Sequence, residues 1–132
     1  MKLHELKVYQ RSMDVGELIW ALVSSWDTFT KDTVGKQLVR SADSVAANLS
    51  EGFGRFFYKE NRRFCYYSRG SLYETFTWIE KAHNRGLISE PDYEALRRDL
   101  GVIVKMLNKY IGSLGRKGTI SEDILPPITD DH

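Results

Sequence analysis

A continuous heptad seam in the last third of the chain limits the possible folds more than any other feature. Its apolar and aromatic residues are spaced alternately three and four apart: Tyr93, Leu96, Leu100, Ile103, Leu107, Tyr110 and Leu114. This spacing is typical of an α-helix that packs against other helices at a shallow angle. Ser89 precedes the seam as a candidate N-cap. Three glycines are expected to end the helix, so we predict it over residues 90–115: Gly112, Gly115 and Gly118.

Residues 1–90 contain no proline, which favours long helices because proline removes a helix hydrogen bond and clashes with the preceding turn. Apolar periodicity predicts three further helices, at about residues 3–26, 34–56 and 59–85. The links between them are short, so consecutive helices are expected to run antiparallel. The sequence therefore predicts an all-α fold, an up-down-up-down four-helix bundle over residues 1–117.

The predicted helices differ in the residues that they offer for packing. In the first helix, the expected core stripe consists of Leu6, Tyr9, Met13, Gly16, Trp20 and Val23, and it is widened by Ile19, Leu22 and Trp26. The second helix is rich in small residues, which let backbones approach closely: Ser41, Ala42, Ser44, Ala46, Ala47, Ser50 and Gly52. Residues 27–33 are expected to form a turn, with Asp32 or Thr33 as the N-cap of the second helix. Gly86 is the expected cap of the third.

Composition and charge place the chain among ordinary globular proteins. Of its 132 residues, 42% are hydrophobic and 28% are charged, which suits one domain with a modest core. No signal-peptide pattern and no membrane-spanning apolar run occur, so we expect a cytoplasmic protein without a membrane partner. The net charge of +1 is uneven, because residues 118–132 contain four acids and no Lys or Arg. Residues 1–117, with 19 basic and 14 acidic side chains, carry +5, and 118–132 is expected to be an extended or disordered tail.

Polar residues occupy positions where the second and third helices are expected to pack. This predicted polar seam comprises Asn48, Glu51, Arg55, Arg69, Ser71 and Glu74. Asn48 and Ser71 take heptad core positions that Leu or Val fills elsewhere. A buried carboxylate is costly unless it is paired, so Glu51 and Glu74 are expected to bind the two arginines. Three interpretations are open: a device that fixes helix register, a ligand or nucleic-acid site, and a catalytic acid–base pair.

The segment from Arg55 to Arg69 combines positive charge with aromatic rings. Its net charge is +4, from the single acid Glu60 and five basic residues, Arg55, Lys59, Arg62, Arg63 and Arg69. Aromatic residues are interleaved with them: Phe56, Phe57, Tyr58, Phe64, Tyr66 and Tyr67. Cations neutralise phosphates and exposed rings stack on bases, which indicates a nucleic-acid surface. The alternative is a solvated basic helix face whose aromatics are buried in the core or in a subunit interface.

No pattern in the chain indicates a metal, a cofactor or a catalytic residue. The histidines lack metal-ligand spacing: His4, His83 and His132. Cys65 is the only cysteine and is expected to be a buried structural thiol. Gly52 and Gly54 do not form a phosphate loop, because no Lys-Ser/Thr follows them and no strand precedes them.

Two motifs lie in the region of the polar seam. The segment Ser44–Arg55 contains Asn-x-x-Glu-Gly-x-Gly-Arg, and Arg-Gly-Ser-Leu-x-Glu follows at Arg69–Glu74. Together with Lys59–Glu60 and the opening Leu6–Gln10, they resemble the signature of bacterial four-helix-bundle proteins encoded in intervening sequences of 23S ribosomal RNA. The resemblance covers roughly residues 3–115. The aromatic run before Lys59 and the acidic tail depart from it.

The resemblance carries expectations about assembly and partners. Members of that family are similar in fold to accessory proteins of diversity-generating retroelements, which form barrel-shaped homopentamers that bind nucleic acid. The resemblance therefore implies a homopentamer with a candidate RNA or DNA surface. Our leading hypothesis is a non-enzymatic homo-oligomer that binds RNA or DNA through the basic residues between Arg55 and Arg69. The alternatives are a structural or protein-interaction scaffold, and a small enzyme that uses Glu51 and Glu74.

Overall fold

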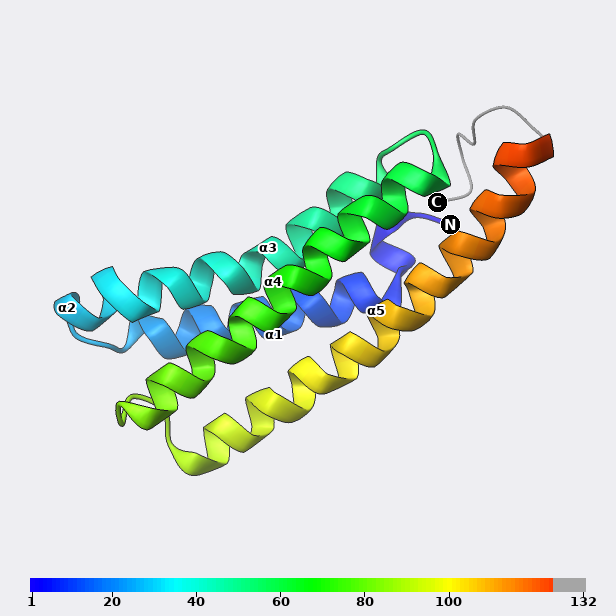
Figure 1. Ribbon diagram of the computed structural model, residues 1–132. Helices are drawn as coiled ribbons and strands as arrows, with labels where there is room; N and C mark the ends of the chain where they lie inside the picture. The colour runs from blue at the N-terminus through cyan, green and yellow to red at the C-terminus, as the bar shows by residue number, and fades with distance from the viewer. Residues whose placement is uncertain (125–132) are drawn as a thin grey trace.

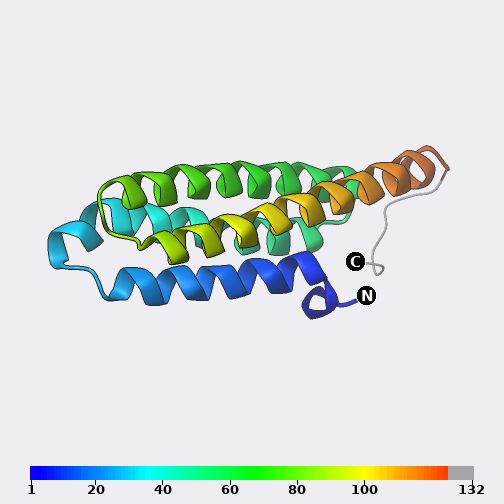
Figure 2. The same ribbon diagram turned by 90° about the horizontal axis from the view of Figure 1, so that it is seen from below.

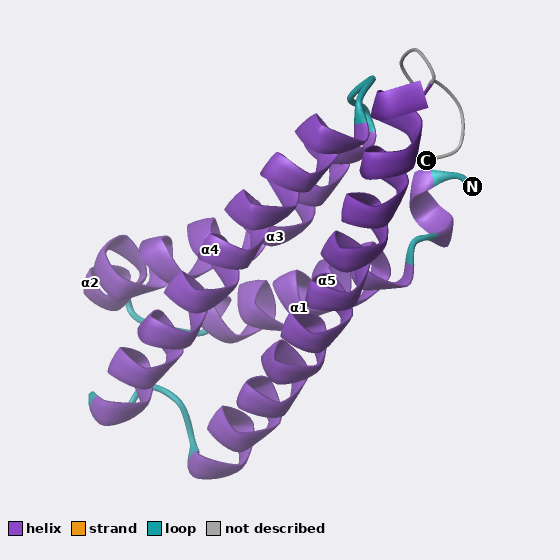
Figure 3. Ribbon diagram, turned by 45° about the vertical axis from the view of Figure 1, so that its right-hand side comes forward, coloured by secondary structure: helices purple, strands orange, loops and turns teal. Residues whose placement is uncertain are grey.

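A computed structural model of the chain describes residues 1–124, with side chains for residues 1–117. Four long helices make up the fold (Figures 1 and 3): α1 (Lys7–Ser24), α3 (Lys36–Phe53), α4 (Tyr58–Asn84) and α5 (Glu90–Ile124). Short helical segments complete it: a 3-10 turn (Leu3–Glu5), α2 (Thr28–Thr30) and a π-helical turn (Lys31–Gly35). No strand occurs in residues 1–124, which confirms the prediction of an all-α fold with four helices. Within the same residues, no helix has both the length and the apolar character needed to cross a membrane.

The long helices lie side by side in the order in which the chain forms them. From the N-terminus, α1 runs along the molecule to α2, and α3 returns beside it (Figures 1 and 2). Next, α4 packs against α3, and α5 packs against α4. Contacts between α5 and α1 close the arrangement, so each long helix has two neighbours around one core.

The predicted caps between α4 and α5 are present. Gly86 has a φ of +74°, a conformation that favours glycine, and its N–H donates to the carbonyl of His83 at 3.0 Å. The next N–H donates to the carbonyl of Ala82 at 2.9 Å, which completes a Schellman motif. At the start of α5, the hydroxyl of Ser89 accepts a hydrogen bond from the N–H of Asp92 at 3.3 Å.

The second long helical stretch begins earlier than the sequence indicates. Its N-cap is Asp27, and not Asp32 or Thr33. The carboxylate of Asp27 accepts hydrogen bonds from the N–H of Thr30 at 2.9 Å and from the hydroxyl of Thr30 at 2.7 Å. These hydrogen bonds lower the pKa of Asp27. The predicted turn is therefore helical from Thr28 onward, because Asp27 satisfies the free N–H groups of the first turn.

The last helix, α5, continues past the predicted end at residue 115 to Ile124. The prediction that glycines end it is wrong, since a glycine weakens a helix by about 1 kcal/mol but keeps its hydrogen-bonding N–H. Gly115 has a packing reason instead: a Cβ there would lie 2.7 Å from Nη1 of Arg62. Residues 118–124 are thus helical and not extended, and the predicted tail over 125–132 lies outside the described residues.

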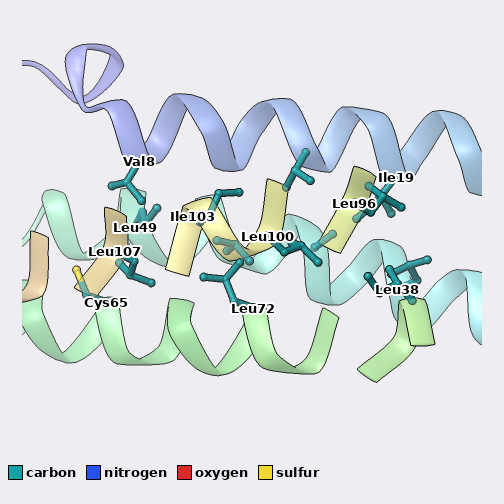
Figure 4. Close-up of a cluster of buried hydrophobic side chains, with 14 of the residues drawn as sticks. Val8, Ile19, Leu38, Leu49, Cys65, Leu72, Leu96, Leu100, Ile103 and Leu107 are labelled. Carbon is teal, nitrogen blue, oxygen red and sulfur yellow. The ribbon is translucent and has the colours of Figure 1, made fainter. Parts of the chain in front are cut away.

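Apolar side chains from all four long helices form the core (Figure 4). Five residues of the predicted α5 seam are buried in it: Leu96, Leu100, Ile103, Leu107 and Leu114. The buried apolar row of α1 consists of Val8, Val15, Ile19 and Val23. The predicted stripe of α1 is wrong in part, because Met13 and Trp20 are 43% and 59% exposed. Both rows of α1 are apolar, so periodicity alone does not identify the one that faces the core.

Candidate nucleic-acid interface

The contact between α3 and α4 fixes which side of the basic segment faces the core. Gly52 of α3 lies so close to α4 that a Cβ would be 2.8 Å from the side-chain oxygen of Asn61. Further along, Ser68 donates to a carbonyl of α3 at 2.8 Å, and the hydroxyl oxygens of Thr75 and Ser41 lie 3.0 Å apart in a hydrogen bond. These α4 residues are fully buried. They form the inner side of α4. The small residues of α3 indicate a close helix contact, but they do not identify which α4 residues take part in it.

The predicted polar seam lies at the edges of this contact and not in one buried network. Asn48 is half-buried, and its amide donates to the carbonyl of Ser44 within α3 at 2.9 Å. Ser71 is also half-buried, and its carbonyl accepts a hydrogen bond from the hydroxyl of Thr75 at 2.7 Å. Asn48 and Ser71 therefore form hydrogen bonds within their own helices, and they lie beside the fully buried residues and not among them.

Each carboxylate of the seam binds its own arginine. Nη2 of Arg55 donates to Oε1 of Glu51 at 2.7 Å, across four residues of the chain. Glu74 pairs instead with Arg40 of α3, and it accepts a hydrogen bond from Nε1 of Trp78 at 3.0 Å. The two carboxylates are thus held in separate, partly exposed ion pairs.

The five predicted basic residues gather around the first half of α4 but point in different directions. Lys59 and Arg63 are exposed. Arg62 and Arg69 are half-buried toward α5, where Nη1 of Arg69 donates to an asparagine at 3.0 Å. Arg55 lies at the link between α3 and α4, with its guanidinium carbon 4.7 Å from the centroid of a phenylalanine ring. The cluster therefore has two exposed cations and three half-buried ones.

The aromatic residues of this region divide between the core and the surface. Tyr58 is buried, with 2% of its surface exposed. Tyr66, Tyr67 and Tyr73 are 49%, 52% and 56% exposed, on the side of α4 that is turned away from Leu72. The alternative of burial in the core therefore holds for Tyr58 and not for Tyr66 or Tyr67. We refer to the following residues as the outer face of α4: Lys59, Arg63, Tyr66, Tyr67, Gly70 and Tyr73.

A buried polar cluster lies on the inner side of α4 and includes Asn61, which no sequence pattern singled out. The amide of Asn61 donates to the hydroxyl oxygen of Tyr110 at 3.1 Å, and its side-chain oxygen lies 3.7 Å from Sγ of Cys65. Burial raises the pKa of Cys65 and that of Tyr110 to about 12. Both groups are protonated at neutral pH, so Cys65 is the buried thiol that the sequence predicts. Among the described residues, no three His, Cys, Asp or Glu side chains are placed to hold a metal ion.

The surface between α1 and α3 carries the opposite charge. A hollow of about 350 Å³ is lined there by Glu17, Asp43, Tyr9, Met13 and small residues. Partial burial, together with the charge of Glu17, raises the pKa of Asp43. A polyanion is repelled by such a surface, so the outer face of α4 is the better location for one.

Comparison with known proteins places this architecture in a family. The family model described as "23S rRNA-intervening sequence protein" matches residues 4–109, a range that includes α1, α3, α4 and much of α5. No curated protein sequence matches the chain.

A solved structure supports the fold. A protein with unknown function from the S23 ribosomal protein family, from Bacteroides thetaiotaomicron VPI-5482, is similar with a TM-score of 0.71 and 23% sequence identity. The match covers 79% of this chain and 97% of that chain. At this identity the likeness concerns the fold, whereas the family match extends over most of the sequence. The chain therefore belongs to the 23S rRNA-intervening sequence protein family.

Proposed function

We propose that this protein is a non-enzymatic, cytoplasmic RNA- or DNA-binding protein whose up-down-up-down bundles assemble into a homopentamer. The observation that carries the proposal is the positive charge around the first half of α4. Residues 55–69 contain five cations and the single acid Glu60, and Glu51 of α3 pairs with Arg55. Lys59 and Arg63 are exposed to solvent. Phosphate neutralisation by Lys and Arg supplies most of the affinity in sequence-independent nucleic-acid binding.

Two further features support parts of the proposal. The family resemblance to pentameric accessory proteins of retroelements favours a homopentamer. The separate ion pairs of Glu51 and Glu74 favour a role without catalysis, since an acid–base pair needs both groups within reach of one substrate.

Binding of the full chain to a structured RNA and to duplex DNA tests the proposal, with fluorescence anisotropy as the readout. We expect micromolar or tighter affinity at low salt, and a steep loss as salt rises, because phosphate contacts release counterions. The absence of binding to either nucleic acid at low salt would overturn the proposal.

A matched pair of charge reversals locates the binding surface on α4. Arg63→Glu changes an exposed cation of the outer face and should weaken binding to both nucleic acids without loss of helicity. Lys81→Glu changes an exposed cation in the second half of the same helix and should have a smaller effect. Equal losses from the two variants would contradict a site in the first half of α4.

The assembly is tested separately by light scattering of the purified chain. A mass near five chains is expected at micromolar concentration, and a monomer would contradict the homopentamer. This measurement is independent of nucleic-acid binding, so either part of the proposal can fail alone.

A protein-interaction scaffold is the second candidate function, and exposed apolar side chains on the opposite part of the bundle favour it. Leu18 and Trp20 of α1 and Phe29 of α2 are 54%, 59% and 78% exposed. Leu18 lies at a hollow beside α5 and Trp20 at a hollow beside α3, so each offers an apolar position to a protein partner. This alternative predicts a stable protein partner, a surface of mixed charge and no salt-dependent binding of nucleic acid.

A further inference from the structure

The outer face of α4 carries exposed tyrosine rings in addition to its positive charge. Tyr66, Tyr67 and Tyr73 are each about half exposed. No other side chain lies within 4 Å of the Cβ position of Gly70, apart from those of its two chain neighbours, so the surface at Gly70 itself is open. An accessible aromatic face of this kind is a platform for stacking with another planar group.

The spacing of the rings suits an extended ligand. Tyr66 and Tyr73 are seven residues apart, so they lie on one side of the helix and about 10 Å apart along its axis. Gly70 lies between them and adds no side chain. A strand that runs along α4 can therefore place bases on both rings and pass over the open surface between them.

Neighbouring side chains hold the rings in place. The guanidinium carbon of Arg69 lies 5.3 Å from the centroid of the Tyr66 ring, on one of its faces. The Phe64 ring meets Tyr67 edge to face, with centroids 5.3 Å apart, and Arg55 packs over Phe64 in turn. Rings that are already ordered lose little conformational freedom when a ligand stacks on them.

The charge around the rings favours an anionic ligand over a second copy of the same face. Lys59 and Arg63 lie one to two turns before the tyrosines, whereas the nearby acids Glu60 and Glu74 lie close to Arg55 and Arg40. Two copies that met through this face would bring like charges together, which is unfavourable. A polyanion relieves that repulsion.

Single-stranded and duplex nucleic acids differ in whether the faces of their bases are accessible to the tyrosines. In a duplex the base faces are covered by stacking, so tyrosine rings on a convex helix reach only phosphates and base edges. Unpaired bases expose both faces, and each stacked base contributes to affinity whatever its sequence. We infer that the outer face of α4 binds single-stranded RNA or DNA by stacking unpaired bases on Tyr66, Tyr67 and Tyr73, while Lys59 and Arg63 bind phosphates. This inference rests on the proposed nucleic-acid binding.

The test compares a labelled oligo-uridine of about 20 nucleotides with a duplex of the same length, by anisotropy on the full chain. The parent protein is expected to prefer the single strand. Tyr66→Ala combined with Tyr73→Ala should weaken single-strand binding at least about tenfold and leave duplex binding unchanged. Tyr66→Phe combined with Tyr73→Phe keeps the rings and should retain the affinity. Arg63→Gln should weaken both ligands and lower the salt slope by about 1.

Three outcomes would overturn the inference, and they differ from failure of the proposed function. Equal affinity for single strand and duplex would overturn stacking while nucleic-acid binding stands. Alanine variants that bind the single strand like the parent would do the same. Alanine variants that keep their helicity but lose their assembled mass in light scattering would assign the face to a second copy. Absence of binding to every nucleic acid at low salt overturns the proposed function itself.

Discussion

The α3–α4 contact and the surroundings of α1 show two ways of packing helices in one bundle. Between α3 and α4, Gly52 leaves no room for a Cβ, and the buried hydroxyls of Ser68 and Thr75 bond across to the other helix. Around α1, surface hollows with volumes between about 210 and 430 Å³ lie along its contacts with α3 and α5. One contact is closely packed and partly polar, and the other is bordered by open hollows that charged and apolar residues line together.

The difference follows from side-chain size at the edges of each contact. α3 presents small residues such as Ser41 and Gly52 to its partner, so the two backbones approach closely. α1 carries Leu18 and Trp20 outside its buried row, where its neighbours leave them more than half exposed. The α3–α4 pair is therefore expected to supply more of the stability of the isolated bundle, whereas α1 retains apolar surface for contacts beyond it.

Truncation of one leucine in each region gives the largest expected contrast. Leu72 is fully buried beside the α3–α4 contact, and Leu72→Ala should lower the free energy of unfolding by about 2–5 kcal/mol. Leu18 is 54% exposed beside the hollow between α1 and α5, and Leu18→Ala should cost less than about 1 kcal/mol. Urea unfolding followed by circular dichroism measures both. A loss for Leu18→Ala as large as that for Leu72→Ala would mean that another chain covers α1.

Two glycine substitutions test how closely α3 and α4 pack. A Cβ at Gly52 would lie 2.8–2.9 Å from atoms of Asn61 and Phe64, including the backbone carbonyl of Asn61. Gly52→Ala should therefore destabilise the fold by about 1–3 kcal/mol, although alanine favours helices. Gly101→Ala is the matched control, because nothing lies within 4 Å of its Cβ position, and it should stabilise α5 by up to about 1 kcal/mol. The close contact would be refuted if both variants gained stability in urea unfolding.

The same contrast explains which parts of the fold are predictable from sequence. In α5 the spacing from Tyr93 to Leu114 defines both the helix and its buried row, because one row there is clearly the most apolar. In α1 two rows are apolar, so the row that faces the core depends on which helices lie beside it. Likewise, the space that a Cβ at Gly115 would need is occupied by Arg62 from another helix. These features require tertiary contacts that a single chain segment does not encode.

In the candidate site, ion pairs between residues close in sequence are predictable, and ion pairs between residues far apart in sequence are not. Glu51 and Arg55 are four residues apart, so spacing alone predicts their ion pair. Glu74 meets Arg40 from 34 residues away, which follows only once α3 and α4 are aligned. The exposure of Tyr66 also depends on which row of α4 faces the core, because aromatic residues surround this helix on several sides.

Charge in the hollow between α1 and α3 gives the smallest expected effect. Partial burial and the charge of Glu17 raise the pKa of Asp43 above 3.8. The folded state therefore favours the protonated form, so this contribution to stability is full below pH 3.8 and is lost as pH rises through the folded-state pKa. Urea unfolding between about pH 3 and 7 should show Asp43→Asn equal to the parent in acid and slightly more stable near neutrality. Glu17→Gln should give a smaller gain. If Asp43→Asn instead lost stability near neutrality, the carboxylate would have a stabilising partner, and the α1–α3 contact would be more tightly organised than its open hollow indicates.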